Sequence, residues 1–275
     1  MMAVDSHQHF WRLDRGDYAW LTKDLAPIYR DFQPADLGPI LARHDIDATV
    51  LVQAAASVAE TDYMLALAAG TAFVLGVVGW VDFASPRAVA DIERLADNPP
   101  LKGLRPMIQD IPESDWMLQP GIRPAMAAMQ RRGLRFDALL KPRHLKPFIK
   151  FLKLYPDLPI VIDHGAKPDI AHGAFDDWAA AMREIARDER VHCKLSGLVT
   201  EARSDWHQRD IRPYADLLID AFGAKRLMWG SDWPVVELAG GYDRWREAAE
   251  NYVARLNDDE QAAILGDTAM RFYDL

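Results

Sequence analysis

Short apolar runs recur along the chain and alternate with longer segments in which apolar residues return every three or four positions. Runs rich in Val, Ile, Leu and Phe are typical of buried strands, and the longer segments have the periodicity of amphipathic helices. Helical periodicity is clear in Glu60–Ala69, Pro86–Ala96, Phe175–Arg187 and Ile211–Phe222. The eight predicted strands are Val4–Phe10, Thr49–Ala55, Val74–Asp82, Leu101–Ile108, Leu134–Leu140, Pro159–Gly165, Val191–Gly197 and Leu227–Trp233.

The alternation of strands and helices predicts a parallel sheet, because parallel neighbours need a crossover segment between them. From the second strand onward, successive strands begin about 25 to 35 residues apart, which corresponds to one βα unit each. Eight such units predict an α/β fold in which residues 1–275 form one domain, a (β/α)8 TIM barrel. A doubly wound open sheet is the main alternative.

Two segments stand outside the regular alternation. Residues 10–49 contain several aromatic residues and little helical pattern before Pro34, so we expect a loop that lies over the barrel mouth. After the last strand, Gly240–Leu256 and Asp258–Tyr273 are predicted to form two helices, with Asp258 as the N-cap of the second.

Composition narrows the class of protein. The net charge of -9 and the pI near 5.4 argue against binding to nucleic acid or to acidic membranes. The sequence has no apolar stretch of about 18 or more residues, and its N-terminus lacks the basic start and apolar run of a signal peptide. A lone Cys193 fits a buried apolar role in a reducing, cytoplasmic setting. We expect a small-molecule partner, and the pattern leaves the oligomeric state open.

Strand residues alternate between two faces, and in a barrel one face fills the interior while the other packs against helices. In Val191–Ser196 the apolar residues share one parity, so Lys194 and Ser196 should point inward. The same reasoning groups Ile160 and Ile162 with His164, Met228 and Gly230 with Asp232, Asp5 with His7 and His9, and Gly103 and Met107 with Arg105.

These inward polar residues approach the C-terminal ends of their strands, where barrel enzymes carry out their chemistry. A spacing of two lets His7 and His9 reach one metal ion or one substrate oxygen, although two ordinary loop imidazoles are the alternative. Asp232 is interpreted as a general base or metal ligand rather than as a turn or helix cap. His164 is interpreted as a site residue rather than as a core histidine with satisfied hydrogen bonds.

Two inward cations and five further histidines complete the inventory of candidates. Lys194 requires a carboxylate partner or substrate oxygens unless its ammonium reaches solvent, and Arg105 requires an internal ion pair or a substrate oxyanion. We assign both to substrate binding. His192 lies deeper on its strand and is interpreted as structural. The remaining histidines are expected to face solvent on helices or loops: His44, His144, His172 and His207.

The strand ends carry short motifs in a fixed order. They are DSHQHFW (Asp5–Trp11), VQA (Val52–Ala54), GWVD (Gly79–Asp82), KGLR (Lys102–Arg105), DHGAKP (Asp163–Pro168), KLSG (Lys194–Gly197), WGSDWP (Trp229–Pro234) and GDTAMRFY (Gly266–Tyr273). Together they resemble the lactonase branch of the amidohydrolase-2 family, in the amidohydrolase superfamily, which includes L-fuconolactonase-like, L-rhamnonolactonase-like and sulfomuconolactone-hydrolase-like proteins. The resemblance covers essentially the whole chain.

The resemblance implies a TIM barrel of the metal-dependent-hydrolase type with His7, His9, His164 and Asp232 in the active site. The wider superfamily often adds a Lys from strand four and a His from strand five, whereas this chain offers Arg105 on strand four and Leu134-Arg-Phe-Asp-Ala on strand five. We therefore expect no two-metal site. The expected cofactor is none, or one weakly bound divalent ion such as zinc, held by His7, His9, His164 and Asp232.

Two further departures concern the substrate. Many members of the branch carry a His directly after the strand-four Arg, where this chain has Pro106, and an Asp-Glu-Pro-Asp stretch is replaced here by Asp110-Ile-Pro-Glu113. The identity of the lactone and its ring size therefore stay open.

Lactone hydrolysis needs an activated water, positive charge near the carbonyl oxygen and a proton for the ring alkoxide. We expect Asp232 to activate the water, the histidines to polarise the carbonyl directly or through one ion, and activity to survive chelation. Flat faces for a sugar ring are expected from Trp11, Trp80 and Trp233, and core packing is an equal alternative for Trp80. The predicted function is a hydrolase that opens the lactone ring of a sugar acid or a similar small cyclic ester. The alternatives are a zinc-dependent decarboxylase of the same broad family and a non-catalytic sugar-acid binding barrel.

Overall fold

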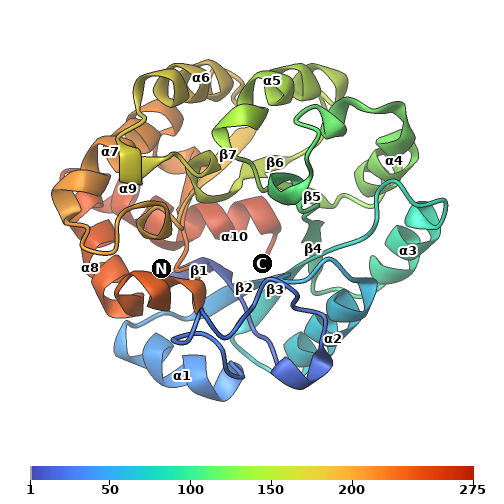
Figure 1. The fold of residues 1–275 in the computed structure, drawn as a ribbon, viewed down its shortest axis with the longest axis horizontal. Coiled ribbons are helices and arrows are strands. Elements are labelled where there is room, and N and C mark those ends of the chain that lie inside the picture. Colours follow the sequence, from blue (N-terminus) through green and yellow to red (C-terminus); the bar gives the residue numbers. More distant parts are fainter. Residues whose placement is uncertain (1) are drawn as a thin grey trace.

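A computed structural model describes residues 2–275 and has eight parallel strands in sequence order, surrounded by a ring of helices (Figure 1). This arrangement confirms the predicted (β/α)8 barrel and rules out the open sheet. Each predicted strand is present, but most are shorter than the apolar run that predicted them. The strands are β1 (Val4–Gln8), β2 (Ala48–Val52), β3 (Val74–Gly79), β4 (Leu101–Leu104), β5 (Arg135–Ala138), β6 (Ile160–Ile162), β7 (Val191–Leu195) and β8 (Leu227–Trp229).

The helices follow the predicted periodic segments closely, and the C-terminal segment differs most. Asn257, rather than Asp258, caps the helix that follows, and its side chain accepts a hydrogen bond from the Glu260 backbone. The segment predicted as one helix is divided into α9 and α10 by a π-helical turn at Ala263–Asp267. The helices are α1 (Pro34–Arg43), α2 (Val58–Ala69), α3 (Ala88–Leu95), α4 (Arg123–Arg131), α5 (Leu145–Leu154), α6 (Asp176–Ala186), α7 (Gln208–Phe222), α8 (Gly241–Val253), α9 (Asp258–Ala262) and α10 (Thr268–Tyr273).

Beyond β8, the chain pairs with β1 and closes the barrel. The Asp232 backbone N–H donates to the His7 carbonyl at 2.8 Å, and the His9 N–H donates to the Trp233 carbonyl at 2.7 Å. Gly230 permits this approach, because a Cβ at that position would lie 2.7 Å from the Cβ of His7. The closing seam therefore joins the backbone of two predicted site histidines to that of the predicted base.

Near the starts of the strands, the barrel interior holds an apolar layer that is covered by α10. Val4, Val161 and Met228 belong to this layer and form one buried cluster with Phe272 and Tyr273 of α10. Figure 1 shows α10 crossing the centre of the strand ring, with the C-terminus nearby. The interior is thus filled by side chains, as expected for a barrel of this size.

The predicted inward face is correct on β7 and wrong on β6 and at the start of β1. On β7, Cys193 is buried against the helices and Lys194 points inward. On β6, Val161 is the inward residue, so the predicted inward placement of Ile160 and Ile162 is wrong. On β1, a shift in register follows Asp5, whose carboxylate accepts a hydrogen bond from Tyr242 of the outer helix α8 at 3.3 Å.

A further correction concerns His144, which was expected to face solvent. It is fully buried, and its Nδ1 accepts a hydrogen bond from the Lys141 backbone at 2.9 Å, in the turn that leads into α5. Burial and the neighbouring cations lower the pKa of His144 to about 4. Among residues 2–275, no helix is long and apolar enough to cross a membrane.

A test of the tight interior is the substitution Gly103→Ala in β4. The added Cβ would lie 2.8 Å from the Arg135 carbonyl oxygen, a backbone atom of the paired strand. We expect the free energy of unfolding to fall by about 1–3 kcal/mol, because the sheet must shift to admit the methyl group. Thermal and denaturant unfolding measure this change.

The matched control is Gly38→Ala in α1, where the nearest atom would be 3.9 Å away on Phe73. Alanine favours a helix over glycine by about 0.5–1 kcal/mol, so this variant should be equal to or more stable than the parent. Equal stability of the Gly103 variant and the parent would contradict the packing argument.

Candidate active site

A cavity of about 270 Å³ opens at the C-terminal rim of the barrel. Four of the predicted site residues line it, namely His9, Arg105, His164 and Asp232. His7 and Lys194 lie beneath this lining and are fully buried. The other lining residues are Trp20, Ala54, Met107, Gln109, Asp110, Leu139, Lys167 and Val235.

Asp232 and His9 form the central pair of this cavity. The His9 Nε2 atom lies 3.2 Å from Asp232 Oδ1, and its Nδ1 lies 2.7 Å from the carbonyl oxygen of Val52. Because a carbonyl oxygen only accepts, Nδ1 must carry a proton, and the Nε2 of a neutral His9 would turn its lone pair toward a carboxylate. A proton or a metal cation between Nε2 and Oδ1 removes this conflict.

The setting of Asp232 keeps its carboxylate ionised. Burial raises the pKa of Asp232, but nearby His164, the hydrogen bond with His9, and His7 lower it further, so that the net pKa lies below its ordinary value. The residue has a left-handed backbone with φ of 59°, which is uncommon outside glycine. The carboxylate is thus charged at neutral pH and placed at the cavity surface.

His164 reaches the cavity through a backbone turn. Val161 points inward on β6, and simple alternation would next place Asp163 inward and His164 outward. His164 has φ of 54°, the first of four successive residues with positive φ, and this turn directs its ring to the cavity. Its Nδ1 lies 2.8 Å from the Ser196 hydroxyl, and a Cβ on Gly197 would lie 2.5 Å from that ring nitrogen. The correct placement of His164 therefore came from an incorrect parity argument.

His7 lies between two cations. Lys194 Nζ is 3.1 Å from its Nδ1, and Arg105 Nη1 is 3.3 Å from its Nε2. Burial lowers the pKa of His7 well below the ordinary value, and Lys194 lowers it further. His7 is therefore a neutral imidazole in this site.

Arg105 is held rigidly at the cavity wall. Its Nη1 donates to Asp163 Oδ2 at 3.2 Å, and its Nη2 donates to both the backbone carbonyl and the side-chain oxygen of Gln53. The residue is 3% exposed yet lines the cavity, so it presents positive charge there without freedom to move. Such a preorganised cation suits a developing oxyanion.

The partner of Lys194 was not predicted from the sequence. Its ammonium contacts Asp137 Oδ2 at 2.7 Å and Asp163 Oδ1 at 3.0 Å, and all three residues are fully buried. Asp137 comes from β5, the strand on which the wider superfamily often carries a histidine. The sequence did contain a signal for this pair. Asp137 is an acidic residue at an inward position of its strand, and an inward lysine needs such a partner.

The aromatic residues are arranged differently from the prediction. Trp11 and Trp233 are buried behind the cavity, each in edge-to-face contact with Phe32. Trp80 lines an adjacent hollow. Trp20 lines the cavity at the barrel rim, is 38% exposed and donates a hydrogen bond to the Ala54 carbonyl at 2.8 Å. The loop over the mouth thus supplies the aromatic wall.

Two groups of residues have ligand atoms close enough to hold one metal ion, within 4.8 Å of one another. The first is His7, Asp163 and His164, but Asp163 is already bound to Lys194 and Arg105. The second is His7, His9 and Asp232, where the lone pair of neutral His9 Nε2 directed at a carboxylate fits a cation. The second set is the better candidate for a single ion.

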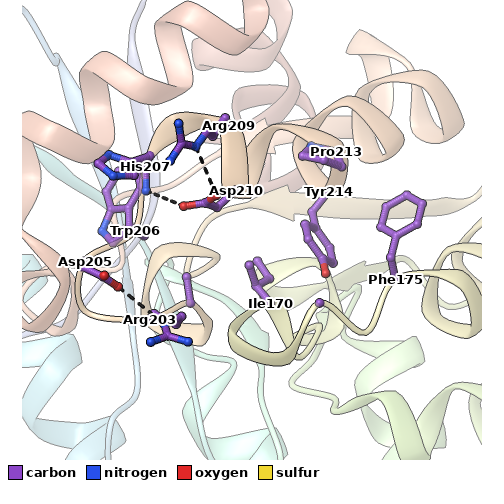
Figure 2. Close-up of a pocket in the computed structure, with 12 residues that line it drawn as sticks. Ile170, Phe175, Arg203, Asp205, Trp206, His207, Arg209, Asp210, Pro213 and Tyr214 are labelled. Atoms are coloured by element: carbon purple, nitrogen blue, oxygen red, sulfur yellow. Dashed lines mark hydrogen bonds and ion pairs between the residues drawn. The ribbon is translucent and has the colours of Figure 1, made fainter.

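A larger hollow, of about 650 Å³, lies elsewhere on the surface, between the start of α7 and the loops that follow β6 and β7. Figure 2 shows its charged residues facing one another, with Arg203 beside Asp205 and Arg209 beside Asp210. These four side chains are largely exposed and neutralise one another. The buried histidine and aspartate cluster lies at the smaller cavity, which is therefore the candidate active site.

Comparison with known proteins identifies the family of this chain. A family model described as amidohydrolase matches residues 4–275. An L-fucono-1,5-lactonase of Burkholderia ambifaria is 47% identical over 98% of this chain and 94% of its own length. An L-fucono-1,5-lactonase of Burkholderia multivorans is 37% identical over 100% of this chain and 96% of its own length.

Among solved structures, an amidohydrolase of Burkholderia multivorans with bound zinc superposes with a TM-score of 0.95 at 36% identity and covers 100% of both chains. The resemblance read from the strand-end motifs is thereby confirmed. The chain belongs to the amidohydrolase family.

Proposed function

We propose that this protein is a lactonase that opens the ring of a sugar-acid lactone by attack of water on the carbonyl carbon. The observation that carries the proposal is the contact of Asp232 with His9 on the wall of a cavity that also presents Arg105. The L-fucono-1,5-lactonases that resemble the whole chain support the same reaction and make L-fucono-1,5-lactone the first substrate to test.

Asp232 acts as the general base in this proposal. Its carboxylate takes a proton from the water whose oxygen attacks the lactone carbonyl. The lowered pKa of Asp232 keeps it ionised but limits its strength as a base. The ester group of an aldonolactone reacts with water more readily than an amide does, so a weak base suffices.

Arg105 and His9 complete the reaction. The fixed guanidinium of Arg105 stabilises the negative charge that develops on the carbonyl oxygen. His9 acts in its imidazolium form, with protons on both ring nitrogens, and donates the Nε2 proton to the ring oxygen as the C–O bond breaks. The 3.2 Å contact then lets Asp232 return the water proton to His9 Nε2. His164 holds its ring beside Asp232 and lowers the pKa of that carboxylate.

A metal ion is not required in this scheme. A divalent ion bound by His7, His9 and Asp232 would supply a Lewis acid for the carbonyl or the water. The two nearby cations oppose such binding, since Arg105 and Lys194 lie within 3.3 Å of the two ring nitrogens of His7. We therefore propose weak binding of at most one ion.

The cavity fits a small deoxy-sugar lactone. One part of its wall is apolar and suits a methyl substituent, while another part offers hydrogen-bonding groups for ring hydroxyls. The apolar residues are Met107, Leu139 and Val235, and the polar residues are Gln109, Asp110 and Lys167. We propose these residues, with Trp20, as the substrate-binding wall in place of the buried Trp11 and Trp233.

A substrate panel tests the function directly. We expect proton release from L-fucono-1,5-lactone and from related aldonolactones, with no loss of CO2 from aromatic carboxylates. Titration with a pH indicator and product analysis by NMR measure both activities. Tight lactone binding without turnover would instead favour a binding protein, and CO2 release would favour a decarboxylase.

The variant Asp232→Asn tests the base. Its kcat should fall by about 10²–10⁴-fold, because the amide cannot accept the water proton. The exposed Asp157→Asn serves as a control for the same chemical change away from the cavity and should retain activity. Unchanged turnover of the Asp232 variant, with its metal content verified, would remove Asp232 from this role.

Chelation tests the role of a metal. After dialysis against a chelator, the protein should contain little zinc by elemental analysis and should retain its kcat/KM, because Arg105 already stabilises the oxyanion. Loss of most activity on chelation, restored by zinc or manganese, would show that an ion supplies the electrophile.

A further inference from the structure

A row of buried polar groups runs from α10, below the barrel, to the underside of the catalytic cavity. The Tyr273 hydroxyl donates to Asp137 Oδ2 at 2.6 Å, and Lys194 Nζ contacts the same oxygen at 2.7 Å. Lys194 then reaches His7 Nδ1 at 3.1 Å. Tyr273, Asp137, Lys194 and His7 are all fully buried, so solvent cannot replace any of these contacts.

Lys194 has two hydrogen-bond acceptors and one further ion-pair partner. Its ammonium donates to Asp137 Oδ2 at 2.7 Å and faces His7 Nδ1 at 3.1 Å, and it lies 3.0 Å from Asp163 Oδ1 without hydrogen-bond geometry. Two of these three partners are carboxylates, which attract the ammonium more strongly than a neutral ring does. The distance between the Lys194 ammonium and His7 therefore depends on which other donors hydrogen-bond to the two carboxylates.

Tyr273 supplies that second donor to Asp137. Asp163 Oδ2 accepts from Arg105, and the Oδ1 atoms of both Asp137 and Asp163 have no hydrogen-bond partner within residues 2–275, so the donors to Asp137 in this set are the Tyr273 hydroxyl and Lys194. Without the phenol, Asp137 would have Lys194 as its remaining donor in this set. The ammonium would then move toward Asp137 and away from His7.

The contact with Lys194 decides the tautomer of His7. When Nδ1 accepts from Lys194, the proton of the neutral ring lies on Nε2, which is 3.7 Å from Asp232 Oδ1. This form gives up Nε2 as an acceptor for Arg105 Nη1 at 3.3 Å, and that donor keeps Asp163 Oδ2 as its acceptor. The opposite tautomer would direct an Nδ1 proton to Asp163 at 3.5 Å and leave Nε2 to accept from Arg105. These two forms offer the cavity opposite hydrogen-bonding groups.

We propose that Tyr273 is a positioning residue that, through Asp137 and Lys194, fixes the ring orientation and the Nε2-protonated tautomer of His7. The kinetic consequence rests on the proposed lactonase function, but the tautomer does not. The residue acts from the closed end of the barrel and lies on the opposite side of His7 from the substrate cavity.

The variant Tyr273→Phe removes the hydroxyl and keeps the ring. We expect kcat to fall by about 10- to 100-fold with KM nearly unchanged, because His7 lies 3.7 Å from the proposed base Asp232 and a change in its ring would disturb the setting of that carboxylate. We also expect the 15N signals of the His7 ring to shift away from the Nε2-protonated form. The signals are assigned by comparison with His7→Gln.

Tyr252→Phe is the matched control. Its ring is buried in α8, and its hydroxyl donates to the Gln208 carbonyl at 3.0 Å, so the same kind of hydrogen bond is lost away from the site. This variant should lose stability without a change in kcat or in the His7 signals. An equal effect of the two variants on kcat would reduce Tyr273 to ordinary packing and overturn the proposal.

A double mutant tests the route. If Tyr273 acts through Asp137, then Tyr273→Phe should cause no further loss of kcat in an Asp137→Asn background. Independent losses that multiply would overturn the proposal. If Tyr273→Phe does not fold, Asp137→Asn replaces it in the NMR test. Unchanged 15N signals of the His7 ring in that variant would overturn the proposal. Absence of lactone turnover in the parent would refute the proposed function and leave the tautomer measurement intact.

Discussion

Closure of the barrel between β8 and β1 is the constraint on which the site depends. The seam uses the backbone of His7, His9, Asp232 and Trp233, and the side chains of His7, His9 and Asp232 belong to the candidate site. Gly230 is needed because any larger residue would push the first strand away. Fold and chemistry are therefore coupled, since the distances between the histidines and the aspartate are set by sheet pairing rather than by flexible loops.

The second requirement is charge balance inside the barrel. Arg105 and Lys194 pair with the carboxylates of Asp137 and Asp163, while Asp232 faces histidines, so the three carboxylates leave one negative charge in excess for a proton or an ion to neutralise. Burial makes each unpaired charge costly, so these groups hold one another in fixed places. The guanidinium of Arg105 lies where the proposed reaction develops an oxyanion, and Arg105 and Lys194 together oppose the binding of a metal ion beside His7.

Much of the fold was predictable because apolar runs and helical periodicity report burial directly, and His9, Arg105 and Asp232 could be placed from their positions at strand ends. Three features were not. The positive φ at His164 is a backbone state that alternation cannot anticipate. Asp137 was overlooked because strand five was compared with a family pattern instead of with the inward lysine. Trp20 belongs to a loop, where no periodicity indicates direction.

Cys193 has a consequence for following the barrel in solution. It is the sole cysteine, it is fully buried on β7, and burial raises the pKa of its thiol. A thiol reagent needs an accessible thiolate, so the folded chain should resist labelling until β7 separates from the helices. The rate of modification at this one sulfur atom thus reports how often the closed barrel opens, without any engineered probe.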